Sequence, residues 1–566
     1  MDDKRNLILA VLLTLVILLG WPFISERFFP APPPAATAQQ EAAGPAQPEG
    51  SAAPTADGQA QLRPLEAVLP ATPRIAIETP RLKGSISLKG ARIDDIVLPG
   101  YRQTVEKDSP PVRLLSPAGT QDAYFAGFGW GGNGFKAPDA NTVWMPDRDT
   151  LTPETPVTLR WDNGQGQSFR IRLSVDKDYM LTVQQAVQNN TAAPVSARAY
   201  GYLSHAGQSK DPSTWTIHTG PVGAFNGAAN YSVDYKTIDK EGNQRFETTG
   251  GWIGFTEHYW HAALIPAQDK PVVAEFRGSN QRYQADMSYG AEMVGPGQTV
   301  TSTSRLFAGA KETRLLDHYA DEGGILLFDR AIDWGWFRWF EKPIFYLLDW
   351  LFKAIGNFGV AIICLTFIVR GVMFPIAQRQ FASMAAMRAI QPKMKAIQEK
   401  YKDDKPKAQQ AILALYKEEK VNPLAGCLPI FLQIPVFFAL YKVLMLAIEM
   451  RHQPFALWIR DLSAPDPLHL LNLFGLLDFT PPAFLGIGLL ALLLGVTMWL
   501  QFKLNPAPMD EMQKQIFAIM PWMMMFVMAP FAAGLLIYWC TSNLLTIAQQ
   551  WWLYRQHPVL SQPAAK

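Results

Sequence analysis

One arginine lies inside a stretch of the chain that otherwise has the composition of a membrane span. Arg370 falls within the apolar run Asn357–Ile376, NFGVAIICLTFIVRGVMFPI. A guanidinium stays charged at physiological pH, and near the centre of a membrane helix it costs about 2.5 to 3.5 kcal/mol. An ionisable residue at that depth favours a functional site, and Thr366 lies one turn earlier on the same helix face. The alternatives are an arginine that snorkels to the interface and one that is paired only for packing.

Polar side chains also occur in the other apolar segments of the C-terminal half, in their inner halves or near their middles. They are Gln433, Thr497, Gln501, Ser542, Asn543 and Thr546. If these faces converge around Arg370, they form a polar cavity that is open to the cytoplasm and closed on the other side. The alternative is that each side chain joins two helices by a hydrogen bond worth roughly 0.6 to 2 kcal/mol.

Composition argues against several classes of function. The chain has 566 residues, a formal net charge of +2 and no dominant basic patch, so nothing points to direct binding of nucleic acid. Its cysteines, Cys364, Cys427 and Cys540, all lie in apolar segments, and no Cys/His cluster could hold a metal. No GxSxG or HExxH motif is present. We therefore expect no metal, no cofactor and no enzymatic activity.

Two segments precede the first folded domain. Residues 1–30 contain the apolar run Leu7–Phe23 after Lys4 and Arg5, which predicts an uncleaved transmembrane anchor with a cytoplasmic N-terminus. A cleaved signal peptide is the alternative. Residues 31–72 are rich in Pro, Ala, Gln and Gly and are expected to form a tether, because they cannot bury enough apolar surface to fold.

The middle of the chain has the period of β-strands. Phe169, Ile171 and Leu173 alternate with polar residues, and turn residues separate similar short runs. Residues 73–330 are therefore predicted to form a large periplasmic antiparallel β-sandwich. Its aromatic residues Trp252, Phe255, Tyr259 and Trp260 are expected in the core, and the alternative is that they line a binding groove. Residues 331–356 alternate tryptophan and phenylalanine with charges, which predicts an amphipathic helix on the outer membrane surface.

Residues 357–555 are predicted to hold five further spans, which with the anchor make six. The expected spans are Asn357–Ile376, Leu424–Ile448, Ala483–Leu500, Ile516–Met528 with its flanks, and Gly534–Trp551. Residues 377–422 carry ten Lys/Arg against five Asp/Glu and are predicted to form a cytoplasmic helical hairpin, with the β-domain on the opposite side. A short cytoplasmic tail, residues 556–566, ends the chain.

Five long motifs resemble the YidC/Oxa/Alb family of membrane protein insertases. The motifs are TFIVRGVMFP, QPKMKAIQEKY, LYKEEKVNPLAGCLPIFLQIPVFFALY, PFALWIRDLSAPDP and SNLLTIAQQ, and the resemblance covers essentially the whole chain. It implies a bacterial inner-membrane insertase with a hydrophilic groove in the inner leaflet. It also implies that the sandwich is the family's supersandwich, which is largely dispensable for insertion.

The resemblance also assigns roles to individual residues. Arg370 matches the family's groove arginine, Thr366 a groove-lining threonine, Gln433 a polar groove position, and Tyr538 an aromatic residue that touches substrates. Trp539 departs from the pattern, because many relatives have a second tyrosine there.

The implied partners are nascent membrane proteins, the Sec translocon and membrane lipids. The hairpin is implied to meet ribosome-nascent chain complexes and the signal recognition particle receptor pathway. The tail after Arg555 carries a single lysine, so ribosome binding by a basic tail is not carried over.

Two other functions are compatible with parts of the pattern. A secondary transporter could use Arg370 as an anion site, although a five-span core without an internal repeat argues against it. A membrane-anchored periplasmic hydrolase or binding protein could place its site in the sandwich, although no catalytic motif is found there. An apolar insert at about residues 472–482 has no functional explanation at the level of sequence.

Overall fold

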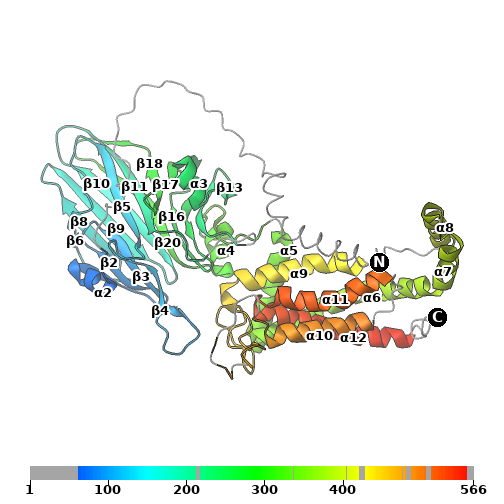
Figure 1. Ribbon diagram of the computed structural model, residues 1–566. Coiled ribbons are helices and arrows are strands. Elements are labelled where there is room, and N and C mark those ends of the chain that lie inside the picture. The colour runs from blue at the N-terminus through cyan, green and yellow to red at the C-terminus, as the bar shows by residue number, and fades with distance from the viewer. Residues whose placement is uncertain are drawn as a thin grey trace.

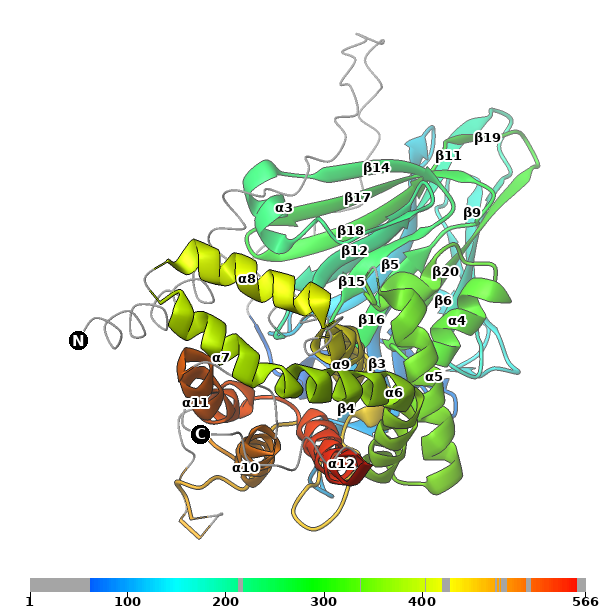
Figure 2. The same ribbon diagram turned by 90° about the vertical axis from the view of Figure 1, so that its right-hand side faces the viewer.

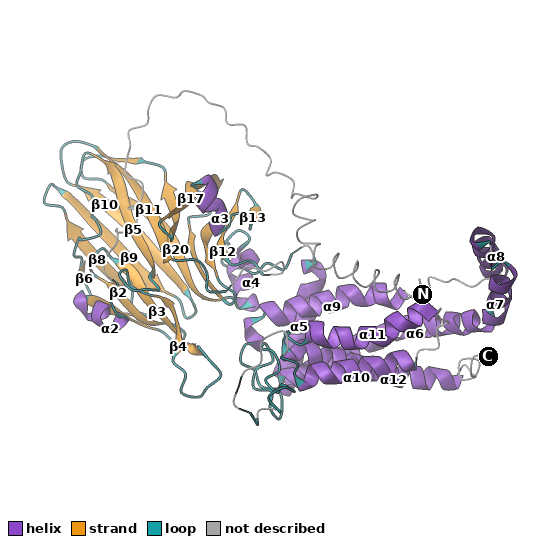
Figure 3. Cartoon of the chain, viewed as in Figure 1, coloured by secondary structure: helices purple, strands orange, loops and turns teal. Residues whose placement is uncertain are grey.

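The structure is a computed structural model that describes residues 62–211, 217–335, 337–402, 404–419, 428–473, 476–477, 479, 486–504 and 511–556. The predicted anchor, most of the predicted tether and all but the first residue of the predicted tail lie outside the described residues. The described chain forms a β-sandwich and a helical bundle, and a helical hairpin extends from the far end of the bundle (Figures 1 and 3). The sandwich and the hairpin therefore lie at opposite ends of the bundle axis.

Two sheets form the sandwich. In spatial order the first contains β14 (Gln244–Thr249), β17 (Pro271–Ser279), β18 (Arg282–Tyr289), β11 (Val195–Ala206), β5 (Tyr124–Asn133), β3 (Arg92–Arg102), β2 (Lys83–Ser87), β1 (Arg74–Glu78) and β7 (Thr150–Leu151), with β19 (Glu292–Val294) on β11 and β4 (Pro111–Leu115) on β3. The second contains β13 (Ala228–Asn230), β12 (Gly220–Phe225), β15 (Trp252–Thr256), β16 (Trp260–Ile265), β20 (Thr299–Ala310), β10 (Met180–Asn189), β9 (Gln167–Val175), β8 (Val157–Asp162) and β6 (Met145–Pro146). The strand pairs are antiparallel except for β1 with β7.

The alternation seen in the sequence sets the faces of the sheets. Along β9, Phe169, Ile171 and Leu173 are buried in the core while their polar neighbours face outward. The predicted β-sandwich is confirmed. Trp252 and Phe255 lie in its core, as expected, whereas Tyr259 and Trp260 are only partly buried and lie beneath the guanidinium of Arg451, the residue that follows η4 (Ile448–Met450).

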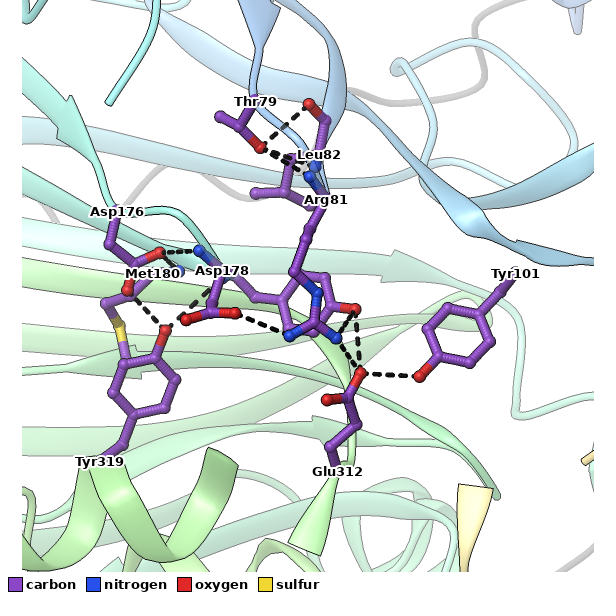
Figure 4. A network of polar contacts seen from close by, with 10 residues as sticks. Thr79, Arg81, Leu82, Tyr101, Asp176, Asp178, Met180, Glu312 and Tyr319 are labelled. Atoms are coloured by element: carbon purple, nitrogen blue, oxygen red, sulfur yellow. Dashed lines mark hydrogen bonds and ion pairs between the residues drawn. The ribbon is translucent and has the colours of Figure 1, made fainter. Parts of the chain in front are cut away.

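A polar network joins the two sheets near the bundle (Figure 4). Arg81, in the turn between β1 and β2, donates to a carboxylate oxygen of Asp178 (2.6 Å), to the hydroxyl of Tyr179 (2.6 Å) and to the carboxylate of Glu312. The hydroxyl of Tyr101 on β3 donates to the same Glu312 carboxylate at 2.7 Å. Because Glu312 immediately precedes α4 (Thr313–Asp321), this network fixes the end of the sandwich from which the chain continues to the bundle.

The helices before the bundle are short except for one. They are α2 (Leu65–Val68), η1 (Leu69–Ala71), α3 (Tyr235–Glu241), α4, η2 (Phe328–Ala331) and α5 (Arg338–Ile355). On α5, Trp339 and Trp350 are exposed, while Phe345 and Leu348 are buried against the protein, as expected for an amphipathic helix. Trp334 is instead buried and precedes the helix, because α5 begins only at Arg338.

The bundle consists of α6 (Phe358–Ala389), α9 (Leu428–Leu446) with η4 (Ile448–Met450), α10 (Leu489–Lys503), α11 (Glu511–Met528) and α12 (Ala533–Gln556). Among the described residues one helix, Phe358–Arg379, is long and apolar enough to cross a membrane, and 433–446, 489–503 and 515–528 are shorter apolar helices. The expected span 357–376 therefore continues without a break into the segment predicted as a hairpin. The two hairpin helices proper are α7 (Gln391–Lys400) and α8 (Lys405–Glu418), which pack through Ile390 and Leu415.

The sandwich and the bundle are joined by several polar contacts. A carboxylate oxygen of Glu449 in η4 accepts a hydrogen bond from the backbone N–H of Thr313, the first residue of α4, at 3.1 Å. Arg314 pairs with Asp349 of α5 at 2.6 Å. Arg451 donates to the backbone carbonyl of Arg102 at 2.8 Å. The outer end of the bundle is therefore held directly against the last elements of the β-domain.

Candidate functional site

Within the apolar segment Phe358–Arg379 of α6, Arg370 lies in the half nearer the hairpin. It is twelve residues from Phe358 and nine from Arg379, which are about 18 Å and about 14 Å of helix. Its Nε donates to the hydroxyl of Ser542 on α12 at 2.9 Å, and an Nη atom donates to the same oxygen. No carboxylate pairs with it among the side chains that the structure describes. The cation is thus held by a neutral hydroxyl and keeps an uncompensated charge.

A second hydrogen-bonded pair, Gln433 with Tyr538, lies next to the Arg370–Ser542 pair, because Tyr538 and Ser542 are both on α12. Tyr538 lies one turn before Ser542 and is almost fully buried. Its hydroxyl accepts a hydrogen bond at 2.7 Å from Nε2 of Gln433 on α9. The structure therefore brings Arg370, Ser542, Tyr538 and Gln433 together from three helices, and we call these four residues the polar group. Three of these four residues were predicted from their place in apolar segments, and Tyr538 from the family resemblance.

Trp539 follows Tyr538 but does not belong to the polar group. Its ring packs on Phe437 of α9, with centroids 4.8 Å apart and planes at 58°. Because the indole is only partly buried, it extends the apolar surface beside the Tyr538–Gln433 hydrogen bond. This position provides an aromatic contact surface rather than a hydroxyl.

Asn543 and Thr497 form a separate pair. The side-chain nitrogen of Asn543 donates to the hydroxyl of Thr497 on α10 at 3.1 Å, while that hydroxyl donates to the carbonyl of Leu493 in its own helix. Consecutive residues on a helix point about 100° apart, so Ser542 faces α6 while Asn543 faces α10. Gln501 lies one turn beyond Thr497, and its buried Oε1 has no partner among the described residues.

Thr366 occupies a different environment from Arg370. Its side chain has no exposed surface, and its hydroxyl donates to the carbonyl of Ile362 one turn earlier, at 2.7 Å. It satisfies its hydrogen bond within α6 and packs in the interior of the bundle. Of the nine predicted site residues, four form the polar group that includes Arg370. Three others, Thr497, Gln501 and Asn543, lie along α10 and its contact with α12, and Thr366 and Trp539 lie outside both sets.

The sequence reasoning overlooked a second buried cation. Lys442 of α9 is buried, and its Nζ donates to the carbonyl of Asp333 at 2.7 Å. Burial raises the pKa of the fully buried Glu341 on α5 to about 7, and the nearby Lys442 charge opposes that shift. The rule that identified Arg370, a charge inside an apolar segment, would also have identified Lys442. Its contacts bind α9 to the start of α5.

The described helices around the polar group differ in the neighbours against which they pack. α12 packs on α6 and α10, α11 packs on α10, and α9 packs mainly on α5. Within the described residues α9 and α11 are not packed along each other, and they are separate in the view along the bundle (Figure 2). Apolar side chains are exposed on both, including Ile434 on α9 and Ile519 and Phe526 on α11. Both helices therefore present exposed apolar surface.

The described residues contain no group of three His, Cys, Asp or Glu side chains that could hold a metal. The chemistry available at the site is a fixed positive charge, several hydroxyl and amide groups, and adjoining apolar surface. Such a set can hydrate and attract a polar peptide segment. It has no nucleophile paired with a general base.

Comparison with known proteins identifies relatives along the whole chain. Residues 74–347 match the family described as the YidC periplasmic domain, and residues 350–560 match the family described as 60Kd inner membrane protein. A membrane protein insertase YidC from Zymomonas mobilis is 49% identical over 98% of this chain and 96% of its own length. Its namesake from Rhizobium etli is 44% identical over 99% and 96%. A crystal structure of an active YidC insertase aligns with 84% of this chain and 92% of that chain, at 18% identity and a TM-score of 0.36.

Proposed function

The chain belongs to the YidC family of membrane protein insertases, and we propose that its polar group around Arg370 receives the hydrophilic tail of a client during insertion. The observation that carries this proposal is the pairing of Arg370 with a hydroxyl instead of a carboxylate. An arginine kept only for packing would be neutralised by an acid, because an unpaired charge inside a membrane is unfavourable. A free positive charge can attract polar and acidic segments as they pass.

The client's apolar segment leaves along a different surface. We place its path between α9 and α11, where apolar side chains are exposed and the two helices are not packed together. Transfer into lipid is favourable by about 0.8 kcal/mol per buried CH₂, and a span contains about 20 residues. The insertion of a single span therefore needs no nucleotide or metal. The polar group lowers the barrier for the tail and leaves the end states unchanged.

The orientation follows from charge and from the shape of the molecule. The family is one of inner-membrane proteins. The sandwich and the basic hairpin lie at opposite ends of the bundle, and cytoplasmic loops carry the excess of Lys and Arg. We assign the hairpin and both termini to the cytoplasm and the β-domain to the periplasm. The division into segments 1–30, 31–72, 73–330, 331–356, 357–555 and 556–566 belongs to the same proposal.

The substrates are membrane proteins undergoing insertion, as for the family. We propose that the hairpin α7–α8 is where ribosome-nascent chain complexes and the signal recognition particle receptor pathway deliver them. Its exposed basic side chains, including Lys395 and Lys402, support a contact with an acidic surface, whereas Lys393 and Lys407 pair with Glu419 and Asp404 of the same hairpin. Cooperation with the Sec translocon would serve clients with large translocated domains.

The test is complementation in cells depleted of their own insertase. Protease protection of a small single-span client reports whether its tail has crossed the membrane. Wild type should restore protection, and Arg370→Ala should not. Arg379→Ala is the matched control, because it removes the same charge from an exposed position at the hairpin end of the same helix. If Arg370→Ala restores protection as well as Arg379→Ala does, the polar group is not where tails enter.

A further inference from the structure

A surface loop at the β-domain end of the bundle exposes an unusual amount of apolar side chain. We define the outer loop as the described residues between η4 and α10, which are 451–473, 476–477, 479 and 486–488. Its exposed apolar side chains are Leu457 (90% exposed), Leu476 (83%), Leu473, Phe479, Leu471 and Leu477. Isolated apolar residues are normal on surfaces, but five exposed large apolar side chains within residues 471–479 mark an interaction surface.

The loop is rigidly attached at its base. Asp466 is almost fully buried, and its carboxylate accepts hydrogen bonds from the indole N–H of Trp458 (2.9 Å), the N–H of Leu468 (3.0 Å) and the N–H of Leu490 in α10 (2.7 Å). The N–H of Ala533, at the start of α12, donates to the carbonyl of Ala464 at 2.8 Å. The leucines are therefore presented by a fixed frame that is tied to two bundle helices.

Two of the exposed leucines occupy a backbone conformation that leucine disfavours. Leu457 has φ of 56° and Leu473 has φ of 49°, both in the left-handed region. Asparagine, aspartate and glycine adopt this region at lower energy, and they are also the usual residues at exposed turns. An exposed leucine in that conformation is unfavourable in water for two reasons, because its backbone is strained and its apolar side chain is hydrated. Its presence indicates that the side chain is covered by something apolar.

The position of the loop identifies the covering material. The loop joins α9 to α10, and it extends from the bundle at its β-domain end (Figures 1 and 2). α10 has 15 residues and is about 22 Å long, while the hydrocarbon core of a bilayer is about 30 Å thick. The N–H of Leu489, the first residue of α10, donates to the carbonyl of Leu468, so the loop directly adjoins the short end of this helix.

We propose that the outer loop inserts its leucines among the lipid acyl chains of the leaflet on the β-domain side. Its apolar side chains adjoin the start of α10 and would supply apolar contact with lipid where that helix ends. The exposed Arg460, which approaches Glu106 of the β3–β4 loop at 3.9 Å, lies on the same loop and would sit at the level of the headgroups. The loop thus anchors the β-domain end of the bundle in the lipid.

The test uses the full chain in lipid nanodiscs, with an environment-sensitive fluorophore on Leu476→Cys and with the native cysteines replaced (Cys364→Ala, Cys427→Ala, Cys540→Ala). Lipids with a nitroxide on the acyl chain should quench the probe, and aqueous iodide should not. Met145→Cys is the matched control, because Met145 is an exposed apolar residue of β6, at the end of the sandwich away from the bundle (Figure 1), where iodide alone should quench. Quenching of the Leu476 probe by iodide would overturn the proposal. A probe reached by neither quencher is covered by protein, and this would also refute a lipid contact.

A second variant separates lipid contact from folding. Leu473→Asn, combined with Leu476→Asn, removes two apolar side chains and places at residue 473 a side chain that suits its backbone conformation. The melting temperature in detergent should be unchanged or higher. Acyl-chain quenching of a probe on Leu471→Cys should fall severalfold. Unchanged quenching would show that the leucines do not hold the loop in the membrane.

Discussion

Replacing Arg370 while varying the charge of a client's tail tests the role of the polar group most directly. Arg370→Lys keeps the charge but has only one nitrogen to offer Ser542, whereas two nitrogens of the arginine now donate to it. Arg370→Ala removes the charge, and Arg370→Glu reverses it. Since a surface that handles many sequences should act through charge more than through a fixed geometry, Lys is expected to retain most of the insertion.

The magnitude depends on how much water the site holds. A tail carboxylate about 6 Å from the guanidinium gains about 2.8 kcal/mol at an effective dielectric constant of about 20, but only about 0.7 kcal/mol in bulk water. These energies correspond to about a hundredfold and about a threefold change in rate for each acidic residue. Loss of one of the two hydrogen bonds to Ser542 costs about 1 kcal/mol, so Lys should fall by less than about tenfold.

The assay is protease protection of one single-span client whose tail is changed from acidic to neutral, with each variant at matched abundance. Arg370→Ala should impair the insertion of acidic tails more than that of neutral tails. Arg370→Glu should impair the insertion of acidic tails further still. Equal insertion by the Arg and Glu forms across the series would reduce Arg370 to a packing or snorkelling residue. A loss with Lys as severe as with Ala would instead require a pairing specific to guanidinium.

Three further predictions concern the β-domain and its orientation. Burial raises the pKa of Glu449 to about 7, above its unfolded value of about 4.5, so the folded state binds the extra proton and stability is lost as the pH rises through about 7. Glu449→Gln, which still accepts from Thr313, should therefore lose less free energy of unfolding than wild type between about pH 5.5 and about pH 8, by about 2 kcal/mol, and an identical pH dependence would refute this. Arg81→Ala breaks the network of Figure 4 at a partly exposed site and should destabilise the β-domain by about 1 to 2 kcal/mol in thermal unfolding, whereas no change would show that the network contributes nothing. Cysteines placed at Gln244 and Lys405 should react with an impermeant maleimide from opposite sides of the membrane, and reaction of both from one side would contradict the proposed topology.

The class of each domain and the unusual charge of Arg370 can be predicted from the sequence without a structure. Alternation along segments such as Phe169–Val175 is sufficient to predict a sandwich, because a strand has only two faces and one must be apolar. A charge within an apolar run is visible without any structure, and so Arg370 could be selected directly. Lys442 carries the same signal, because it is also a charge within an apolar run and is buried in the structure.

Tertiary structure alone decided which polar groups meet. Ser542 and Asn543 are adjacent in the chain, yet one binds Arg370 and the other Thr497, because the partner of each depends on which helices flank α12. The same holds for Thr366, which shares a helix with Arg370 but is turned into the bundle. Helix packing angles and neighbours depend on contacts between residues far apart in sequence, and local periodicity contains no information about them. For this reason the sequence could propose a polar cavity but could not divide its residues between two separate groups.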